Sequence, residues 1–285
     1  MNEAVGAGRP DPAGATPPAI EMVERHPLRV LRWPALDAEG LDVVVTTRAG
    51  GVSTGPYESL NLGLHVGDQP DRVVENRRRA AAALGAAPSD LVFANQVHGR
   101  AVAQVGTNDR GRGLHRTDDA LEGVDALVTT EPGVAMVILV ADCVPIVLAD
   151  ADAGVLAVVH AGWRGTTAGV VTAALSAMGA LGARPERIRA GLGPAIAPAR
   201  YQVGRDVADA MAENYGDTGG LLWPDGPDHW TLDLWAANRA SLLAAGVPAG
   251  QIHLAGMATG RGGPFFSDRD QRPCGRFGLL ARIRP

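Results

Sequence analysis

The chain of 285 residues is 46% hydrophobic and 20% charged, a composition that excludes a disordered protein and allows a large core. Its net charge is −5, all its basic residues are arginine, and none form a stripe, which argues against nucleic-acid binding. Two cysteines, Cys143 and Cys274, are too few for a disulfide framework and are typical of a reducing compartment.

Residues 1–26 are rich in proline, glycine and alanine and predict a disordered tail, which leaves residues 27–285 as one catalytic domain. The tail lacks the basic start and apolar core of a signal peptide. The longest apolar run, residues 133–149, is interrupted by Asp142 and Pro145 and is too short to span a bilayer. We therefore expect a cytoplasmic protein without membrane or nucleic-acid partners, and we favour a monomer.

Strand and helix signals then alternate irregularly along the chain. Strands are predicted over residues 41–48, over 90–105 as two strands around a turn at 98–100, within 125–165, and over 187–194. Helices are predicted over residues 71–85, 166–182, 203–216 and 232–246, and a loop followed by a strand ends the chain. Mixed elements without strict βαβ alternation indicate an α/β or α+β fold with a mixed sheet.

The stretch ILVADCVPIVLAD places a carboxylate and a thiol, Asp142 and Cys143, inside a buried strand, where an unpaired charge is costly. A hairpin turn over residues 150–154 would put Val144 opposite His160. Cys143 and His160 would then lie within one residue of a direct cross-strand pair, where Cβ atoms are about 4.5–5.5 Å apart. This proximity suits a shared metal or a cysteine–histidine catalytic pair.

His98 is the third candidate, because it ends an apolar strand just before a glycine turn. One cysteine and two histidines are a zinc ligand set, and three protein ligands leave an open position for water. The alternative is a buried structural Cys143 with two surface-turn histidines, and the spacing alone gives both interpretations similar weight.

Two glycine turns carry an arginine. Arg164 precedes a helix expected to begin at Thr166, where free N–H groups favour anions, and Arg48 lies in a second such turn. His65 and Arg269 are further polar residues in apolar, glycine-containing surroundings. The alternative is that each of these residues is structural or exposed.

Seven motifs occur in order and together resemble the bacterial laccase-domain family, also called the multicopper polyphenol oxidase or peptidoglycan editing factor family. They are TTRAGGVSTGPYESLNLGLHVGD, NQVHG, ADCVPIVLAD, VVHAGWRGT, GLGPAI, YQVG and FFSDRD. The resemblance covers about residues 41–283. It implies a single α/β domain in α-β-β-α layers with mixed sheets, and a Zn²⁺ site formed by His98, Cys143 and His160.

The resemblance also implies phosphorolysis of adenosine, inosine, guanosine and methylthioadenosine, with adenosine deamination as a second activity. Arg48, Arg164 or Arg269 could hold phosphate, and Asp142 could move protons or orient a metal ligand. The expected site is catalytic Asp142 and Arg48, with substrate contacts from Arg48, Asn61, His65, Arg164, Ser267 and Arg269. The last motif departs from the family pattern F-F-S-Y-R-R at Asp268 and Asp270, which changes the contacts expected there.

Four other functions stay open. The runner-up is an amidase that removes misincorporated L-serine from a cell-wall precursor, since the same zinc site would serve an amide. A copper-dependent oxidase is less expected because the sequence has no His-x-His pair, although copper could load in vitro. The third function is a zinc-free hydrolase with Cys143 as nucleophile and His160 as base. The fourth is a zinc-binding module without catalytic activity.

Overall fold

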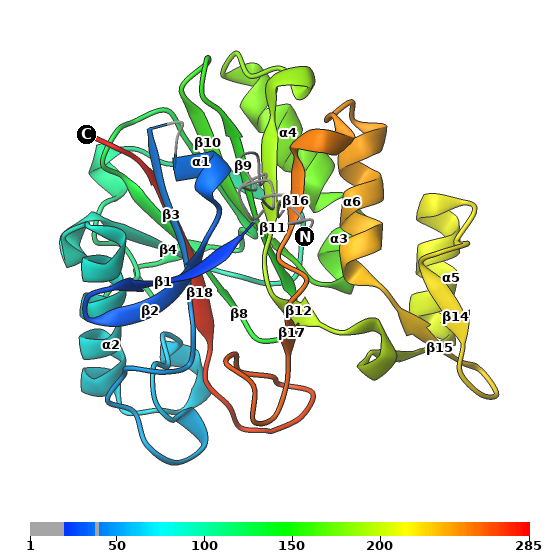
Figure 1. Cartoon of the computed structure of the whole chain (residues 1–285), viewed down its shortest axis with the longest axis horizontal. Coiled ribbons are helices and arrows are strands. Elements are labelled where there is room, and N and C mark those ends of the chain that lie inside the picture. The colour runs from blue at the N-terminus through cyan, green and yellow to red at the C-terminus, as the bar shows by residue number, and fades with distance from the viewer. Residues whose placement is uncertain (1–19, 38–39) are drawn as a thin grey trace, which may run out of the picture.

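A computed structural model describes residues 20–37 and 40–285 of the chain. Two large mixed sheets pack face to face, and helices cover the outer face of each sheet (Figure 1). This arrangement confirms the α/β class and the α-β-β-α layering that the family resemblance implies. Among the described residues, no helix combines the length and the apolar character needed to cross a membrane.

The first sheet has seven strands, and some of them, such as the β-branched run LDVVVT, are almost entirely buried. Its spatial order is β1 (Glu21–Arg25), β2 (Leu28–Arg32), β3 (Leu41–Thr46), β18 (Phe277–Ile283), β8 (Ala135–Val140), β4 (Leu91–Asn95) and β6 (Leu121–Glu122). The C-terminal strand β18 thus lies in the middle of the sheet, between β3 and β8.

The second sheet has six strands and carries the central hairpin of the molecule. Its order is β16 (Ile252–Leu254), β11 (Arg189–Leu192), β9 (Val144–Asp150), β10 (Val155–Ala161), β7 (Ala126–Thr129) and β5 (Val102–Gln104). Two small sheets join β12 (Ala195–Ile196) to β17 (Ala258–Thr259), and β13 (Gln202–Gly204) to β15 (His229–Leu232) and β14 (Leu222–Pro224).

Six helices are described, and most of them lie on the outer faces of the two sheets. They are α1 (Pro34–Asp37), α2 (Pro70–Leu84), α3 (Trp163–Ala168), α4 (Val170–Ala180), α5 (Arg205–Tyr215) and α6 (Leu234–Ala244). Helix α2 packs on the first sheet, whereas α3 and α4 pack on the second, with α6 against α4. Figure 1 shows α5 and the β13–β15–β14 sheet projecting from the body as an arm.

The helix expected over residues 166–182 is in fact two helices. Gly169 adopts a positive φ of 81°, which ends α3 and lets α4 start in a new direction. Helix α3 also begins at Trp163, three residues before the expected start. Thr166 is therefore not a helix N-terminus but a buried residue of α3 whose hydroxyl bonds the side chain of Asn238. The predicted helix start at Thr166 was wrong, and anion binding by Arg164 stays a prediction.

Two other expectations also need correction. Residues 21–25 form β1, which pairs with β2, so they belong to the fold rather than to the predicted tail. The adjacent residues Met22 and Val23 pack against different core clusters. Residues 1–19 of that tail lie outside the described residues, so the expectation that they are not a signal peptide stays a prediction. The two strands predicted within 90–105 exist as β4 and β5 but lie in different sheets.

The register of the β9–β10 hairpin decides where the site forms. Asp150 pairs with Val155 and His160 pairs with Pro145, one residue away from the predicted register. Cys143 is then a diagonal neighbour of His160, and diagonal neighbours share one face of a sheet. That face is the one between the two sheets, because Cys143 packs against the same core cluster as Leu156 and Val158 of β10.

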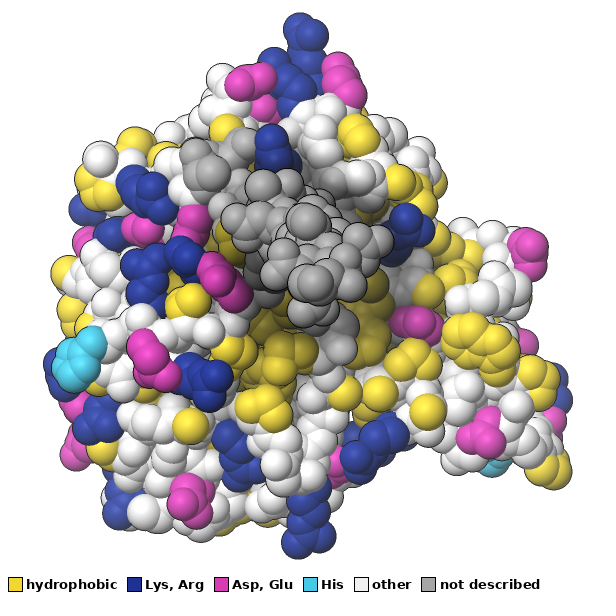
Figure 2. Space-filling view, viewed as in Figure 1, with side chains coloured by type: hydrophobic (Ala, Val, Ile, Leu, Met, Phe, Trp, Pro, Cys, Tyr) yellow, Lys and Arg dark blue, Asp and Glu magenta, His cyan; other side chains and the backbone are white. Residues whose placement is uncertain are grey.

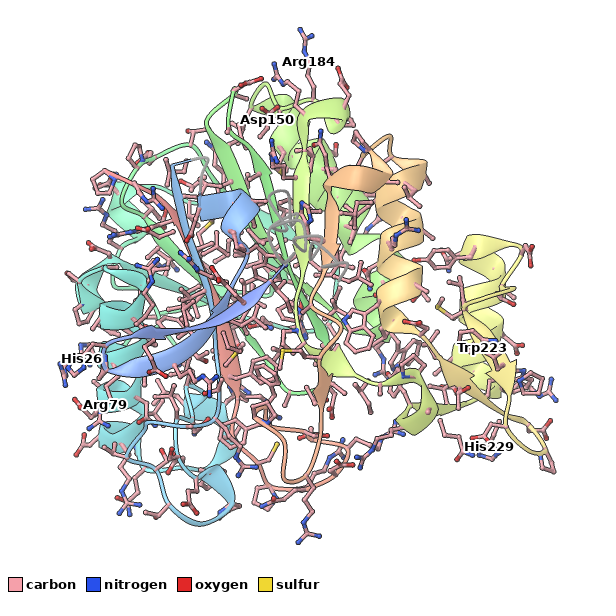
Figure 3. All side chains as sticks on the ribbon, viewed as in Figure 1. His26, Arg79, Asp150, Arg184, Trp223 and His229 are labelled. Atoms are coloured by element: carbon pink, nitrogen blue, oxygen red, sulfur yellow. The ribbon has the colours of Figure 1, made fainter. Side chains whose placement is uncertain are left out.

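Asp150 explains the difference in register. Its carboxylate is fully buried and accepts hydrogen bonds from the backbone N–H groups of Ala153 and Arg184 and from the Arg187 side chain. These partners keep Asp150 in the strand, so the turn is one residue shorter than predicted. Figure 3 shows Asp150 and Arg184 together at one end of the molecule. Cys143 precedes the opposite end of β9, so the site lies at that other end.

The projecting arm joins the body beside the site. Its tip carries Trp223, which is 43% exposed, and Figure 3 shows Trp223 and His229 on this arm, away from the sheets. Figure 2 shows apolar side chains gathered on the same arm. At its root, Tyr201 follows a short 3₁₀ turn over Pro198–Arg200, and its ring reaches back into the cavity described below.

Candidate metal centre and cavity

Three side chains converge between the ends of the two sheets. His98 follows β4 of the first sheet, Cys143 lies on the connection from β8 to β9, and His160 is on β10 of the second sheet. Their ligand atoms all lie within 4.8 Å of one another, and the two imidazole rings meet edge to face at 4.7 Å. The structure thus brings together the three residues that the sequence proposed as metal ligands.

A buried carboxylate that the sequence analysis missed, Asp125, organises this cluster. Its oxygens accept hydrogen bonds from the backbone N–H groups of Val97 (3.3 Å), His98 (2.9 Å) and Gly99 (2.6 Å), and one oxygen contacts Nδ1 of His160 at 2.8 Å. The three backbone bonds hold His98 at a φ of 61°, a conformation uncommon for residues other than glycine. With Nδ1 engaged, Nε2 of His160 is left to bind a metal.

The electrostatics of the cluster favour a thiolate beside an imidazolium. Burial raises the pKa of Cys143, but the charge of His160 and hydrogen bonds from both histidines outweigh it and lower the pKa to about 6. Burial lowers the pKa of His160, but Cys143 and Asp125 outweigh it and raise the pKa to about 9. A thiolate and two imidazoles form a donor set that suits zinc, so the residues fit a metal.

Gly162 makes room for the ligands. It lies just past the end of β10, beside Cys143, and a Cβ added to it would be 2.8 Å from Sγ of Cys143 and 3.0 Å from Cδ2 of His98. The backbone at Gly162 has a φ of −80°, which any residue can adopt. The absence of a side chain there is therefore a requirement of the cluster rather than of the turn.

We expect Gly162→Ala to lower metal content and to destabilise the protein by about 1–3 kcal/mol, because the new methyl group must displace two ligands. Metal analysis of protein purified without added metal, together with chemical unfolding, measures both effects. Gly179→Ala is the matched control: no atom lies near its Cβ position on α4, so it should keep its metal and gain about 0.5–1 kcal/mol. Normal metal content and stability in Gly162→Ala would contradict this interpretation.

Asp142 lines the cavity but is held by neighbouring segments. One oxygen accepts the hydroxyl of Thr259 at 2.5 Å and the other accepts the backbone N–H of Arg269 at 2.7 Å. Its own carbonyl accepts the N–H of Ile196, and its φ is 92°. With both carboxylate oxygens engaged, the geometry favours the second of the two roles expected of Asp142, the positioning of Cys143, over proton transfer.

The cluster opens into a cavity of about 590 Å³ that lies across the ends of both sheets. Beside the metal ligands, the Arg164 guanidinium lies over the Trp163 ring at 4.3 Å, and that of Arg269 lies over the Tyr201 ring at 5.0 Å. Burial raises the pKa of Tyr201, and the nearby charge of Cys143 raises it further, so the phenol stays protonated. Two aromatic–arginine pairs therefore flank the candidate metal centre.

Of the predicted substrate contacts, Arg164, Arg269 and His65 line the cavity, whereas Arg48, Asn61 and Ser267 do not. The Arg48 guanidinium instead donates to the carbonyl of Glu58 at 2.8 and 3.0 Å, with its charge over the Phe266 ring. In this structure Arg48 holds its own glycine loop, and its role in anion binding and catalysis stays a prediction.

Asn61 and Ser267 also serve the loops around the cavity. Asn61 is fully buried and bonds the backbone of Gly63, the N–H of Arg276 and the carboxylate of Asp68. The Ser267 hydroxyl accepts the N–H of Asp270. These bonds shape the wall without placing either side chain in it.

The two unusual acids of the last motif have partners. Asp268 lines the cavity and pairs with Arg272 at 2.6 Å and Arg276 at 3.0 Å. Asp270 pairs with Arg200 at 2.6 Å. The departures from the family pattern thus place one carboxylate in the cavity wall, between two arginines.

Comparison with known proteins places the chain in a family. The family model described as multi-copper polyphenol oxidoreductase laccase matches residues 42–284. A Deinococcus radiodurans protein named purine nucleoside phosphorylase is 43% identical over 246 residues, covering 85% of this chain and 90% of that protein. A protein named adenosine deaminase RL5, from an unknown prokaryotic organism, is 40% identical over 221 residues, covering 76% and 84%.

A solved structure agrees with these sequence matches. YlmD from Geobacillus stearothermophilus superposes with a TM-score of 0.85 at 36% identity, covering 93% of this chain and 99% of that one. From sequence and fold together, the chain belongs to the multi-copper polyphenol oxidoreductase laccase family.

Proposed function

We propose that this protein is a zinc-dependent purine nucleoside enzyme that cleaves adenosine, inosine, guanosine and methylthioadenosine by phosphorolysis and also deaminates adenosine. The observation that carries the proposal is the convergence of His98, Cys143 and His160 at the floor of a cavity flanked by aromatic–arginine pairs. The names of the relatives, purine nucleoside phosphorylase and adenosine deaminase, support the same chemistry.

Zinc held by these three residues would supply a Lewis acid at the cavity floor. The rings of Trp163 and Tyr201 offer apolar faces to a planar purine, and Arg164 and Arg269 keep positive charge beside them. In phosphorolysis a phosphate oxygen bonds to the sugar C1′ as the bond to the purine nitrogen breaks, and the nitrogen takes a proton. The Tyr201 hydroxyl, which stays protonated, lies in the cavity as a hydrogen-bond donor.

We expect adenosine with phosphate to give adenine and ribose 1-phosphate, and adenosine without phosphate to give inosine more slowly. The first reaction needs a bound phosphate and the second needs water, so omitting phosphate separates them. Chromatography of the products from the metal-loaded protein, against a control without enzyme, is the measurement. Cleavage of a muramyl-L-serine precursor with neither adenine nor inosine formed would instead establish the amidase function.

A second candidate function rests on one contact. Because Asp125 contacts His160, the residues Cys143, His160 and Asp125 are arranged like the catalytic triad of a cysteine hydrolase. Removal of all metal with a chelator separates the zinc enzyme from the cysteine hydrolase. Hydrolysis by the metal-free protein would favour Cys143 as nucleophile. The ring of His98 also lies within 4.8 Å of the same sulfur, which supports the metal, since a hydrolase needs one base.

We also propose that the enzyme acts on small molecules in the cytoplasm as a monomer. Both cysteines are free, and a thiolate ligand is best preserved in a reducing compartment. Gel filtration coupled to light scattering checks the monomer.

A further inference from the structure

The cavity is positively charged although the protein is acidic. Five arginines and two aspartates line it, whereas the whole chain has a net charge of −5. The arginines are Arg77, Arg164, Arg269, Arg272 and Arg276, and the aspartates are Asp142 and Asp268. A neutral nucleoside does not need this excess of charge, which instead favours an anionic group.

Arg77 is the most unusual of these arginines. It extends from α2, is 2% exposed, and lies over the Phe93 ring at 3.9 Å. Its guanidinium donates to the backbone carbonyls of Leu62, Gly113 and Leu114, and no carboxylate of the described residues forms an ion pair with it. Burial lowers the pKa of Arg77 to about 9, with Asp119 offsetting only part of the effect.

A buried charge without an ion pair is costly, because the distant charge of Asp119 repays only part of the desolvation. The three carbonyls orient the guanidinium, but they carry no net charge to neutralise it. An anion that enters the cavity would supply this missing charge.

Two further donors accompany Arg77. His65 feels the charges of both Arg77 and Arg276, which, after burial, lower its pKa to about 4, so the imidazole is neutral and able to donate one hydrogen bond. Arg276 also lines the cavity, and it shares the single carboxylate of Asp268 with Arg272. Arg77, Arg272 and Arg276 therefore face two carboxylates, Asp268 in ion pairs and Asp119 without one, and keep an excess of about one positive charge.

This group is separate from the one beside the metal ligands. Its members come from α2, from the turn after Gly63 and from the segment before β18, all on the side of the first sheet. Trp163, Arg164 and Tyr201 come from α3 and the root of the arm, on the side of the second sheet. One cavity therefore holds two differently built ends.

We propose that His65, Arg77 and Arg276 form a subsite that binds a phosphate group. At Arg77 the Nε and Nη1 groups already donate to backbone carbonyls, which leaves Nη2 to donate to a phosphate oxygen, and the excess of positive charge favours an anion. The proposal rests on the proposed function only in that phosphate is its co-substrate. The phosphate group arrives either as inorganic phosphate or as part of a phosphorylated nucleoside, and both present the same oxygens to this end of the cavity.

Calorimetry on the full metal-loaded chain tests the subsite, with inorganic phosphate and adenosine 5′-monophosphate titrated separately at fixed ionic strength. Arg77→Gln and Arg276→Gln should each weaken binding about ten- to 100-fold, the usual effect of losing a charged hydrogen-bonded partner. Arg78→Gln is the matched control, because Arg78 neighbours Arg77 on α2 but pairs with Glu75 at the surface. It should bind like the wild type.

The two ligands identify the source of the phosphate group. Binding of inorganic phosphate that both cavity variants weaken supports a subsite for the free co-substrate; binding of the monophosphate alone, weakened likewise, supports a phosphorylated substrate. If Arg77→Gln does not fold, Arg276→Gln and His65→Gln carry the test. Equal affinity in wild type, Arg276→Gln and His65→Gln, or no binding of either ligand, overturns the subsite. Adenosine deamination needs no phosphate, so its outcome tests the proposed function independently.

Discussion

A Cys143→Ser variant is expected to lose its metal and at least about 10³-fold of its nucleoside turnover, because Lewis-acid stabilisation at such sites is worth several kcal/mol. Serine keeps the size of the side chain but replaces a soft thiolate, whose pKa is lowered to about 6, with a hydroxyl that stays protonated. The wild type should carry about one zinc per chain, as measured by elemental analysis, and His98→Ala should lose it as Cys143→Ser does.

Cys274→Ser provides the control for this experiment. Cys274 is buried, its pKa is raised by burial, and it is not part of the three-residue cluster. The variant should therefore keep its zinc. Circular dichroism of all variants separates loss of metal from loss of fold. Unchanged zinc content in both His98→Ala and Cys143→Ser would remove the assigned metal centre.

Asp125→Ala is expected to destabilise the protein by about 3–5 kcal/mol and to weaken metal binding about ten- to 100-fold. The substitution removes a fully buried carboxylate and leaves three backbone N–H groups and the Nδ1–H of His160 without their acceptor. It also releases His98 from its left-handed conformation. Urea unfolding of the metal-free protein measures the first effect, and competition with a chelator measures the second.

Asp125→Asn keeps the shape and refines the interpretation. Its amide retains one oxygen acceptor but turns an NH₂ group toward donors that need an acceptor. We expect metal affinity between that of the wild type and that of Asp125→Ala. An alanine variant with normal stability and normal metal affinity would show that Asp125 does not organise the cluster.

The metal ligands could be predicted because each stands at a break in an apolar pattern. His98 and His160 each directly precede a glycine turn or lie within two residues of one, and Cys143 interrupts the longest apolar run. The register that linked Cys143 to His160 was nevertheless one residue off, since the buried bonds of Asp150 belong to a loop distant in sequence. The prediction of proximity survived because the true register keeps both residues on one face.

Asp125 and Arg77 could not be found this way. A single aspartate before a strand gives the same sequence pattern whether its carboxylate is solvated or, like that of Asp125, is contacted by four polar groups of the protein. Arg77 is the first of three consecutive arginines on a helix, a pattern typical of an exposed face, and only packing against Phe93 and the carbonyls of Gly113 and Leu114 selects it for burial. Arg48 shows the reverse case, because an arginine in a glycine turn can hold the turn itself, as the bonds from Arg48 to the carbonyl of Glu58 do.

The three metal ligands are distributed over both sheets: His98 follows a strand of the first, His160 lies on the second, and Cys143 lies on a connection between them. A complete donor set therefore exists only while the sheets are docked, so metal occupancy and the integrity of the whole domain are linked by mass action. At a free metal concentration of 100 times Kd this linkage adds about 2.7 kcal/mol to the unfolding free energy. Stripping the metal should thus lower the midpoint of global unfolding rather than loosen a single loop, and zinc supply would set the thermal limit of the protein.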